Sequence, residues 1–416
     1  MKPSADDVRQ EVRGWLEAHW DPELPVREWR ARLAESGWGC PTWPQEWYGR
    51  GLEPWVARVV QDELRAAGAV GPAVGVGMTL TAPTLLAHGS DDVKHRLLRR
   101  IITGEDTWCQ LFSEPGNGSD LAGLTTRATR DGDEWVIHGQ KVWTTGAHHA
   151  AFGMLLARTD WDAPKHRGIS FFAFPMRQEG VEVRPLRQMN GRASFNEVFI
   201  DDARVSHANL VGELHEGWAV AQTTLANERG LAASLFGALP PPGGGRTREE
   251  ATAEAAAYLK TYEWYPQRAG RADLVPLRAR SLGVGHDPLV RDLVAHLHAT
   301  EQTARLTAER STARRRAGRP GPEGSIGKLA ASRIAREAAS AHARLAGAHG
   351  MLTGADSPED GIVAEVLVSV PGASIAGGTD EIQHNIIGER VLGLAKDPSV
   401  DAEIPFRQVH TNRDTR

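Results

Sequence analysis

Apolar residues recur every three to four positions through roughly the first hundred residues, a spacing typical of amphipathic helices. The first helix is expected to begin behind Ser4, a residue type that often caps helices. The residues on its apolar face are Val8, Val12, Trp15, Leu16 and His19. The same spacing predicts further helices at residues 26–35, 54–67 and 91–102. We therefore expect an N-terminal helical domain.

Between residues 109 and 215 the pattern changes to the alternation of strands. The segment TTRATRDGDEWVIHGQKVWTTG predicts a strand, an Asp-Gly turn and a second strand, with Trp135 and Ile137 on one face. GISFFAFP and SFNEVFID are further short runs rich in aromatic and β-branched residues. This region is predicted to be a small β-domain.

After residue 216 the helical pattern returns. The predicted helices span residues 218–237, 287–317, 323–348 and 380–394. The run ALPPPGGG, which follows the first of them, must end any helix before it. The chain is thus expected to be mainly α with a central β-domain. Its predicted parts are an N-terminal helical domain (1–108), a middle β-domain (109–215) and a C-terminal helical bundle (216–416).

Composition narrows the class of protein. The 416 residues are 41% hydrophobic and 24% charged, which is ordinary for a soluble globular protein and long for a single core. A formal net charge of −5 offers no broad positive field for nucleic acid or acidic membranes. The two cysteines, Cys40 and Cys109, favour a reducing compartment, and no leader-like or spanning apolar run is evident. We expect a cytoplasmic protein without a nucleic-acid or membrane partner.

Several patterns resemble other kinds of site only superficially. GPEGSIGKLA has Leu329 where a phosphate loop needs Ser or Thr. GPAVGVG lacks the full dinucleotide fingerprint. His296 and His298 are two residues apart, so on a helix they point to different sides. No metal site is expected.

Two segments of the β-region carry residues suited to a flat heterocycle. In CQLFSEPGNGSDLAGLTTRA, the small residues Gly116, Gly118 and Ser119 form a loop that can bring backbone N–H groups close to a phosphate or ring carbonyl. Taken alone, this loop is more simply explained as a tight turn. In GQKVWTTGAHH, Trp143 offers a flat apolar surface, and Thr145 offers a hydroxyl two residues later on the same strand face.

SEPGNGSD, GQKVWTTGAHH and the later GGTDEIQHNIIGERVLGL, taken in this order, resemble the acyl-CoA dehydrogenase family. The resemblance implies a helical N-terminal domain, a β-barrel-like middle domain and a C-terminal four-helix bundle. It also implies FAD, with its ring system against Trp143 and its N5 near Thr145. By the same resemblance, Phe112 and Ser113 face the ring, and Gly118 and Ser119 line the pyrophosphate or the CoA path. The residues assigned to the cofactor are Phe112, Ser113, Gly118, Ser119, Trp143, Thr145 and Thr379.

The reaction implied by the resemblance is dehydrogenation of an acyl-CoA thioester to the trans-2-enoyl-CoA. A carboxylate takes the α-proton while a hydride leaves the β-carbon for flavin N5, and the electrons pass to an electron-transfer flavoprotein or similar acceptor. The position that often holds this carboxylate is Gly377 here, in AGGTDE. The base must therefore lie elsewhere, or the chemistry is lost.

Some branches of the family carry the base on the first helix of the C-terminal bundle, in a Leu-x-x-Glu-Arg stretch. Here that stretch is TTLANERGLAA, which makes Glu228 the predicted catalytic base. Spacing alone would favour a structural ion pair for Glu228. Asp380 and Glu381 are the alternative bases. By the same resemblance, Arg229 and Ser119 are predicted to bind the CoA part of the substrate.

The resemblance leaves function and partners open at three points. A flavin-dependent monooxygenase on the same scaffold and a non-catalytic subunit are the alternative functions. In the family, an Arg-x-x-Phe-Gly motif and a glutamine contact the FAD of a neighbouring subunit. Here the first motif is missing after residue 237, and Arg344 stands where the glutamine is usual. A sister subunit is therefore predicted to complete the flavin site. Arg246, Arg248 or Arg344 could replace these contacts instead. The acyl group is open, with bulky steroid or branched acyl chains as one option.

Overall fold

The computed structural model describes residues 3–228, 239–319, 321, 323–354, 357–396, 398, 401 and 403–409. They form two compact units. Unit 1 comprises Met1–Leu186, Ala193–Thr261 and Ser399–Arg416, and unit 2 comprises Arg187–Arg192 and Tyr262–Pro398. The division into 1–108, 109–215 and 216–416 stays a prediction, since the helical segment 217–261 belongs to unit 1 by its contacts.

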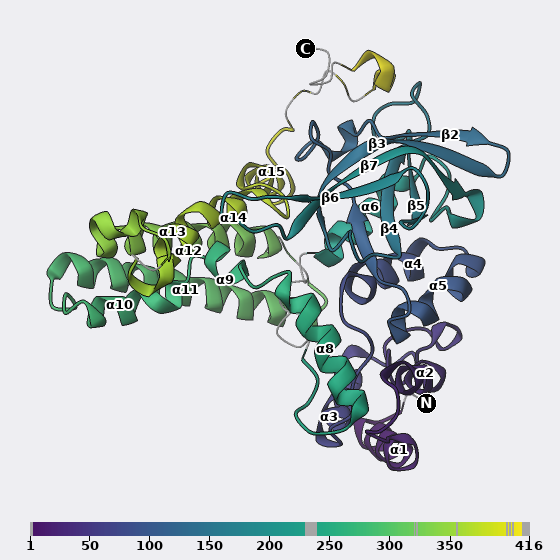
Figure 1. The fold of residues 1–416 in the computed structure, drawn as a ribbon, viewed down its shortest axis with the longest axis horizontal. Coiled ribbons are helices and arrows are strands. Elements are labelled where there is room, and N and C mark those ends of the chain that lie inside the picture. The colour runs from purple at the N-terminus through teal and green to yellow at the C-terminus, as the bar shows by residue number, and fades with distance from the viewer. Residues whose placement is uncertain are drawn as a thin grey trace. The chain divides into compact units, whose positions relative to one another are not determined.

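The four N-terminal helices that the sequence predicts begin at the expected residues. Ser4 caps α1, because its hydroxyl accepts the Asp7 backbone N–H while the Asp7 carboxylate accepts the Ser4 N–H, a reciprocal capping box. The described helices of this unit are α1 (Ala5–His19), α2 (Val26–Ser36), α3 (Pro54–Ala66), α4 (Ala82–His88), α5 (Asp91–Thr103), α6 (Gly217–Glu228) and α8 (Arg246–Lys260) (Figure 1). The four N-terminal helices predicted from spacing are confirmed, and α4 with the preceding π-helical turn Gly77–Thr81 was missed.

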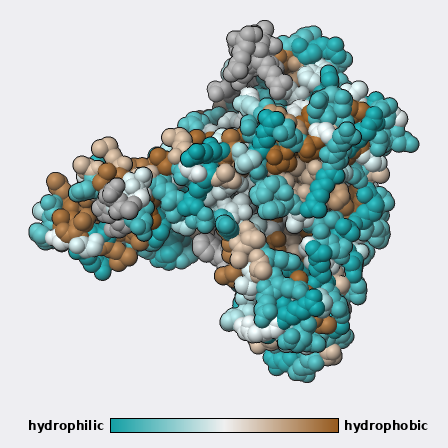
Figure 2. All heavy atoms as spheres, viewed as in Figure 1, coloured by the Kyte–Doolittle hydropathy of each residue, from teal (hydrophilic) through white to brown (hydrophobic). Residues whose placement is uncertain are grey.

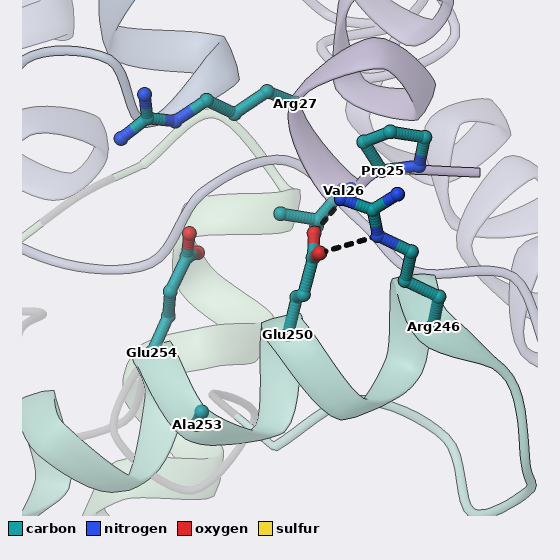
Figure 3. A pocket seen from close by; sticks show the side chains of 7 residues that line it. All are labelled: Pro25, Val26, Arg27, Arg246, Glu250, Ala253 and Glu254. Atoms are coloured by element: carbon teal, nitrogen blue, oxygen red, sulfur yellow. Dashed lines mark hydrogen bonds and ion pairs between the residues drawn. The ribbon is translucent and has the colours of Figure 1, made fainter. Parts of the chain in front are cut away.

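Helix α8 returns to the N-terminal helices, which the sequence analysis did not foresee. Its buried positions are the small residues Thr247, Ala251 and Ala255, so no large apolar stripe marks it. Glu250 Oε2 accepts the Val26 N–H at the start of α2 at 2.8 Å (Figure 3). This hydrogen bond, the Arg30–Glu254 ion pair and the packing of Ala251 in the N-terminal core hold α8 against α2.

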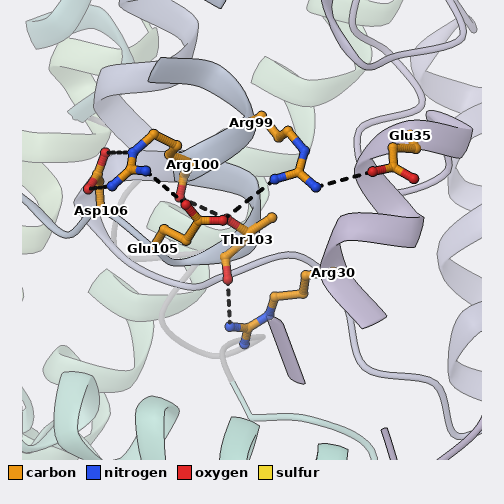
Figure 4. A network of polar contacts seen from close by, with 7 residues as sticks. All are labelled: Arg30, Glu35, Arg99, Arg100, Thr103, Glu105 and Asp106. Carbon is orange, nitrogen blue, oxygen red and sulfur yellow. Dashed lines mark hydrogen bonds and ion pairs between the residues drawn. The ribbon is translucent and has the colours of Figure 1, made fainter. Parts of the chain in front are cut away.

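A network of charged side chains fixes the turn that leads into the sheet (Figure 4). Arg100, in the last turn of α5, holds Asp106 through two hydrogen bonds of 2.6 and 2.8 Å. Arg99 bridges Glu105 and Glu35 of α2. These contacts hold Glu105 and Asp106 in place just before the first strand.

The described strands form one curled sheet of seven: β1 (Trp108–Leu111), β2 (Arg127–Asp131), β3 (Glu134–Thr145), β4 (Phe152–Arg158), β5 (Ile169–Pro175), β6 (Val181–Leu186) and β7 (Phe195–Ser206). Their order is β1-β4-β2-β3-β7-β6, with β5 paired to β4. The hairpin β2–β3 turns at Gly132, as its Asp-Gly pair predicts, and Trp135 and Ile137 are buried. The strands β1, β4 and β6 were not predicted.

Unit 2 is helical. Its described helices are α9 (Tyr265–Arg268), α10 (Val275–Ser281), α11 (Pro288–Arg316), α12 (Glu323–Ala346), α13 (Ile362–Ser369), α14 (Pro371–Ile375) and α15 (Asp380–Arg390) (Figure 1). The long helix α12 packs against α11 and α15. Alanines at its buried positions let neighbouring helices approach closely. The predicted fold class, mainly α with a central β-domain, is confirmed.

One described stretch, Ile362–Arg390, is long and apolar enough to pass a composition test for a membrane span. It is not one continuous helix. Pro371 begins α14, and Ala376 is extended, so the stretch is divided among α13, α14 and α15. This stretch gives no argument for a membrane span.

Candidate functional site

The loop after β1 is built around a buried carboxylate. Glu114 accepts the backbone N–H and the hydroxyl of both Thr125 and Thr126 at 2.6–2.9 Å, and the Lys141 ammonium at 3.1 Å. Burial alone would raise the pKa of Glu114, but the Lys141 ammonium and these hydrogen bonds outweigh it and lower the pKa from 4.5 to about 2. The carboxylate therefore stays ionised and holds both ends of the loop.

The tip of this loop is open. Glu114 and Asn117 exchange two backbone hydrogen bonds, which closes a tight turn. A side chain added at Gly116 or Gly118 would meet nothing within 4 Å. Gly118 and Ser119 are exposed. Their backbone is therefore accessible to solvent, and phosphate binding by this loop stays a prediction.

The start of the loop lies beside β3. Lys141 Nζ donates to the Phe112 carbonyl at 3.1 Å, and the Val142 N–H donates to the Ser113 carbonyl at 2.9 Å. Phe112 is buried, and its ring packs edge-on against Phe171. The structure thus brings Phe112 and Ser113 next to the strand that carries Trp143.

Trp143 stands on a β-bulge. The pairing of β3 with β7 shifts between Lys141 and Thr144, and Trp143 has a φ of +63°, a left-handed conformation that is rare for such a bulky residue. Its side chain is 56% exposed, and its ring lies nearly perpendicular to that of Phe195, with 5.5 Å between the ring centroids. Such strain is often found at ligand sites. The exposed indole is therefore the clearest feature of a ligand platform in unit 1.

The bulge also changes the expected strand geometry. The prediction that Trp143 and Thr145 share a face assumed unbroken alternation, which the bulge interrupts. Thr145 is half-buried and pairs with Phe195, whose ring the indole touches. The hydroxyl of the intervening Thr144 is buried without a hydrogen-bond partner among the described residues. Unsatisfied buried groups of this kind call for an explanation, and an unfilled ligand contact is one.

Glu228, the predicted base, is the last described residue of α6. Its carboxylate accepts a hydrogen bond from Gln110 Nε2 on β1 at 3.3 Å. Gln110 is two residues before Phe112, so the carboxylate lies close to the start of the glycine loop. Glu228 is half-buried. Arg229, predicted to bind the substrate, lies outside the described residues.

The region of the missing carboxylate lies in unit 2. Gly377 has a φ of +70°, which a glutamate would adopt only with strain. Thr379 caps α15 by accepting the Ile382 N–H at 3.2 Å. Asp380 pairs with Lys328 at 2.9 Å and Arg336 at 2.6 Å. Its burial is outweighed by these two partners, which hold the pKa of Asp380 far below its ordinary range.

Sequence reasoning missed three residues that shape the site, namely Glu114, Lys141 and Gln110. A signal for Lys141 was present, because it continues the inward alternation of Trp135 and Ile137 on one strand. A lysine in an inward strand position is unusual unless it is paired. Glu114 and Gln110 carry no comparable local signal.

The residues present fit a flavin nucleotide. An open glycine loop can approach a diphosphate, and an exposed indole beside it can support a flat ring. A half-buried carboxylate near the same loop can exchange a proton with a substrate. The fold and this arrangement are compatible with the class of flavin-dependent oxidoreductases.

Comparison with models of known protein families identifies the family to which the chain belongs. Models of the acyl-CoA dehydrogenase N-terminal, middle and C-terminal domains match residues 3–105, 109–203 and 278–392. The chain belongs to the acyl-CoA dehydrogenase family and is an oxidoreductase acting on acyl-CoA. This confirms the resemblance found in the sequence. The family is one of flavoproteins.

Two relatives from Mycobacterium tuberculosis illustrate the range of similarity. Acyl-CoA dehydrogenase IpdE1 is 35% identical over 416 residues, which cover 94% of this chain and 98% of the relative. Acyl-CoA dehydrogenase FadE34 is 47% identical over 206 residues, which cover 50% of this chain and 29% of the relative.

Solved structures share the fold. The Tcur3481-Tcur3483 steroid acyl-CoA dehydrogenase matches with a TM-score of 0.66 and 26% identity over 95% of this chain and 99% of that one. A chain of the ChsE4-ChsE5 complex from Mycobacterium tuberculosis matches with a TM-score of 0.60 and 29% identity, over 95% and 99%. Both are complexes of two different chains by their names.

Proposed function

We propose that this protein catalyses the FAD-dependent α,β-dehydrogenation of an acyl-CoA thioester to the trans-2-enoyl-CoA. The observation that carries the proposal is the Gln110–Glu228 hydrogen bond of 3.3 Å. This bond holds Glu228, the strongest candidate for the base among the described residues, beside strand β1, which leads into the glycine loop. The α-proton of the substrate would pass to Glu228.

The proposed cofactor contacts that the structure describes around the glycine loop and β3 belong to unit 1. Trp143 would support the flavin ring and Thr145 would place its hydroxyl near N5, while Phe112 and Ser113 would present backbone and hydroxyl groups to the ring. Gly118 and Ser119 would take up a diphosphate. The assignment of Thr379, the cap of α15, to the cofactor stays a prediction from the sequence. FAD bound there would accept the hydride from the substrate β-carbon.

The alternative bases are weaker on chemical grounds. A general base works best when its pKa lies near the working pH. The two cationic partners of Asp380 keep its pKa far lower than that. The pKa of Glu381 is lowered as well, by its backbone N–H and by Thr379 at the start of α15. Glu228 is therefore the proposed base, with Arg229 as the proposed contact to CoA.

The function is tested by reduction of an artificial electron acceptor with a panel of acyl-CoAs. The panel should contain straight-chain, branched and steroid acyl groups, since solved relatives include a steroid acyl-CoA dehydrogenase. We expect dye reduction with enoyl-CoA as product for at least one class. Oxygenated product, formed with consumption of reduced flavin, would instead establish the monooxygenase alternative.

Trp143→Ala should lower flavin retention, because the ring system loses its apolar support. Retention is measured as the ratio of flavin to protein absorbance after gel filtration. Phe199→Ala, on the neighbouring strand β7, is the control, because it removes an aromatic ring that is covered by Arg184 and is not proposed to contact the flavin. A folded Trp143→Ala protein with full flavin and an unchanged flavin spectrum would show that the ring does not lie there.

We further propose that the protein works as a hetero-oligomer with a sister acyl-CoA dehydrogenase subunit. Arg246 and Arg248, the possible substitutes for the missing contact across subunits, are already used within unit 1 by Glu250 and by the Gly68 carbonyl. Unit 2 exposes apolar side chains typical of an interaction surface, and brown spheres gather on its α10 and α13 end (Figure 2). The most exposed are Leu289, Met351, Leu392, Ile375, Leu394 and Leu306.

Expression of this chain alone tests the hetero-oligomer. We expect weak flavin binding, because a diphosphate without its charge-assisted donors is held poorly. Co-expression with a sister chain should restore one flavin for each pair of chains, measured by flavin content and mass photometry. A homo-oligomer with one tightly bound FAD per chain and full activity would refute this proposal.

A further inference from the structure

A segment from the C-terminal part of the chain returns to the sheet of unit 1. The Phe406 N–H donates to the Ala163 carbonyl and the Arg407 N–H donates to the Trp161 carbonyl, each at 3.0 Å. Pro405 forms a bridge with Pro164. Residues 403–409 with Asp401, here called the return segment, therefore follow the loop between β4 and β5.

Phe406 covers a buried cation. Arg158, at the end of β4, is fully buried, and its guanidinium lies 3.4 Å from the centroid of the Phe406 ring. Phe406 itself is 1% exposed. Burial lowers the pKa of Arg158 to about 10, so it remains charged at neutral pH. A cation in such a place needs compensation, which the ring face and hydrogen bonds supply.

The hydrogen bonds of Arg158 hold the far end of the glycine loop. The guanidinium donates to the carbonyls of Ala122 at 2.6 Å and Leu124 at 3.2 Å, and to that of Lys165 at 3.1 Å. Ala122 is three residues after Ser119, the exposed serine of the loop tip. The position of the loop thus depends on a guanidinium that Phe406 shields from water.

A second connection joins the return segment to the same loop. Lys165 Nζ lies 2.7 Å from Asp401 Oδ2 and 3.1 Å from Asp120 Oδ2. Asp120 directly follows Ser119, and its carbonyl accepts the Gly123 N–H at 3.0 Å. The ammonium therefore bridges the return segment to the residue beside the loop tip.

We infer that Phe406 and Asp401 are positioning residues that hold the loop 116–124 ready to bind a diphosphate, either that of the flavin nucleotide or that of CoA. The inference rests on the proposed function of this loop. Without the ring, water reaches the guanidinium and competes for its hydrogen bonds to Ala122 and Leu124. The loop would then have to be ordered at the moment of binding, which weakens affinity.

The test uses the full chain with its partner, if one is required, and four variants. Phe406→Ala removes the cover, Phe406→Leu keeps an apolar group without a ring, and Asp401→Asn breaks the charged bridge. Gln408→Ala, an exposed position on the same turn, is the control. Hydrogen exchange of residues 114–126 measures loop order. Flavin dissociation and the KM for acyl-CoA distinguish the two sources of the diphosphate.

We expect faster exchange in the loop of Phe406→Ala, with at least a tenfold rise in the flavin Kd or in the KM. The kcat with saturating ligands should stay within about twofold, because the loop is loosened and not removed. Phe406→Leu and Asp401→Asn should be intermediate, and Gln408→Ala should match the parent protein.

Unchanged loop exchange in Phe406→Ala would overturn the inference, whatever the activity. Faster exchange with unchanged flavin Kd and KM would also overturn it, since the loop would then not need this support. If the parent protein binds neither flavin nor CoA, the proposed function fails as well, and the exchange measurement still decides whether the return segment orders the loop.

Discussion

Glu228→Gln should lower the rate of dehydrogenation by at least about 10²-fold while flavin retention stays unchanged, a loss typical of removing a general base. Glutamine keeps the size of the side chain and its ability to accept the hydrogen bond from Gln110. It cannot take up the α-proton. The measurement is single-turnover reduction of the bound flavin by the best acyl-CoA of the panel.

Glu381→Gln is the matched control, because it neutralises an exposed carboxylate at the alternative position. Its rate should stay within a few-fold of the parent rate. Near-normal turnover in Glu228→Gln would exclude Glu228 as the base. A large loss in Glu381→Gln alone would move the base to the start of α15.

Glu114→Gln should lower the free energy of unfolding by about 3–5 kcal/mol, the usual cost of breaking a buried ion pair. The change leaves the Lys141 ammonium fully buried and without its carboxylate partner. Denaturant unfolding followed by tryptophan fluorescence measures the loss. Glu182→Gln removes the exposed pair with Arg184 and should cost at most about 1 kcal/mol.

The double variant Glu114→Gln with Lys141→Met sharpens this test. Removing both charges should cost less than removing the carboxylate alone, because no unpaired ion is left in the interior. A single variant as stable as the parent protein would mean that the pair contributes nothing. A double variant less stable than the single one would mean that Lys141 acts chiefly through the Phe112 carbonyl.

The Glu114–Lys141 pair also predicts that the free energy of unfolding falls at acid pH. The folded protein lowers the pKa of Glu114 from 4.5 to about 2, so its contribution is complete above about pH 4.5. The contribution is lost as the pH falls from about 4.5 toward 2, when the folded protein must also bind the proton. The stability of the parent protein should therefore fall more steeply over this range than that of Glu114→Gln.

The sequence predicts those parts of the fold that carry a strong local signal. Ser4 and the stripe behind it predict α1, and Asp131-Gly132 predicts the turn of the first hairpin. Helix α8 was missed because its buried face consists of threonine and alanine. The strands β1 and β4 are buried along nearly their whole length, so they lack the alternation that identified β3.

The site could be predicted only in part. The family motifs led to Trp143 and the glycine loop, and the outward indole and open loop agree with that reading. The bulge under Trp143 follows from its pairing with β7, which no local pattern reveals. The contact of Gln110 with Glu228 joins residues 118 positions apart, and such contacts exist only once the chain has folded.

Unit 1 is assembled from separate stretches of the chain, and this has a consequence for biosynthesis. A ribosome releases residues in order, so the sheet and most of its helices emerge before unit 2 is translated, while the return segment emerges after it. During that interval Arg158 is a cation without its aromatic cover. A nascent chain that pauses within unit 2 would thus carry all seven strands but lack the ring that covers Arg158.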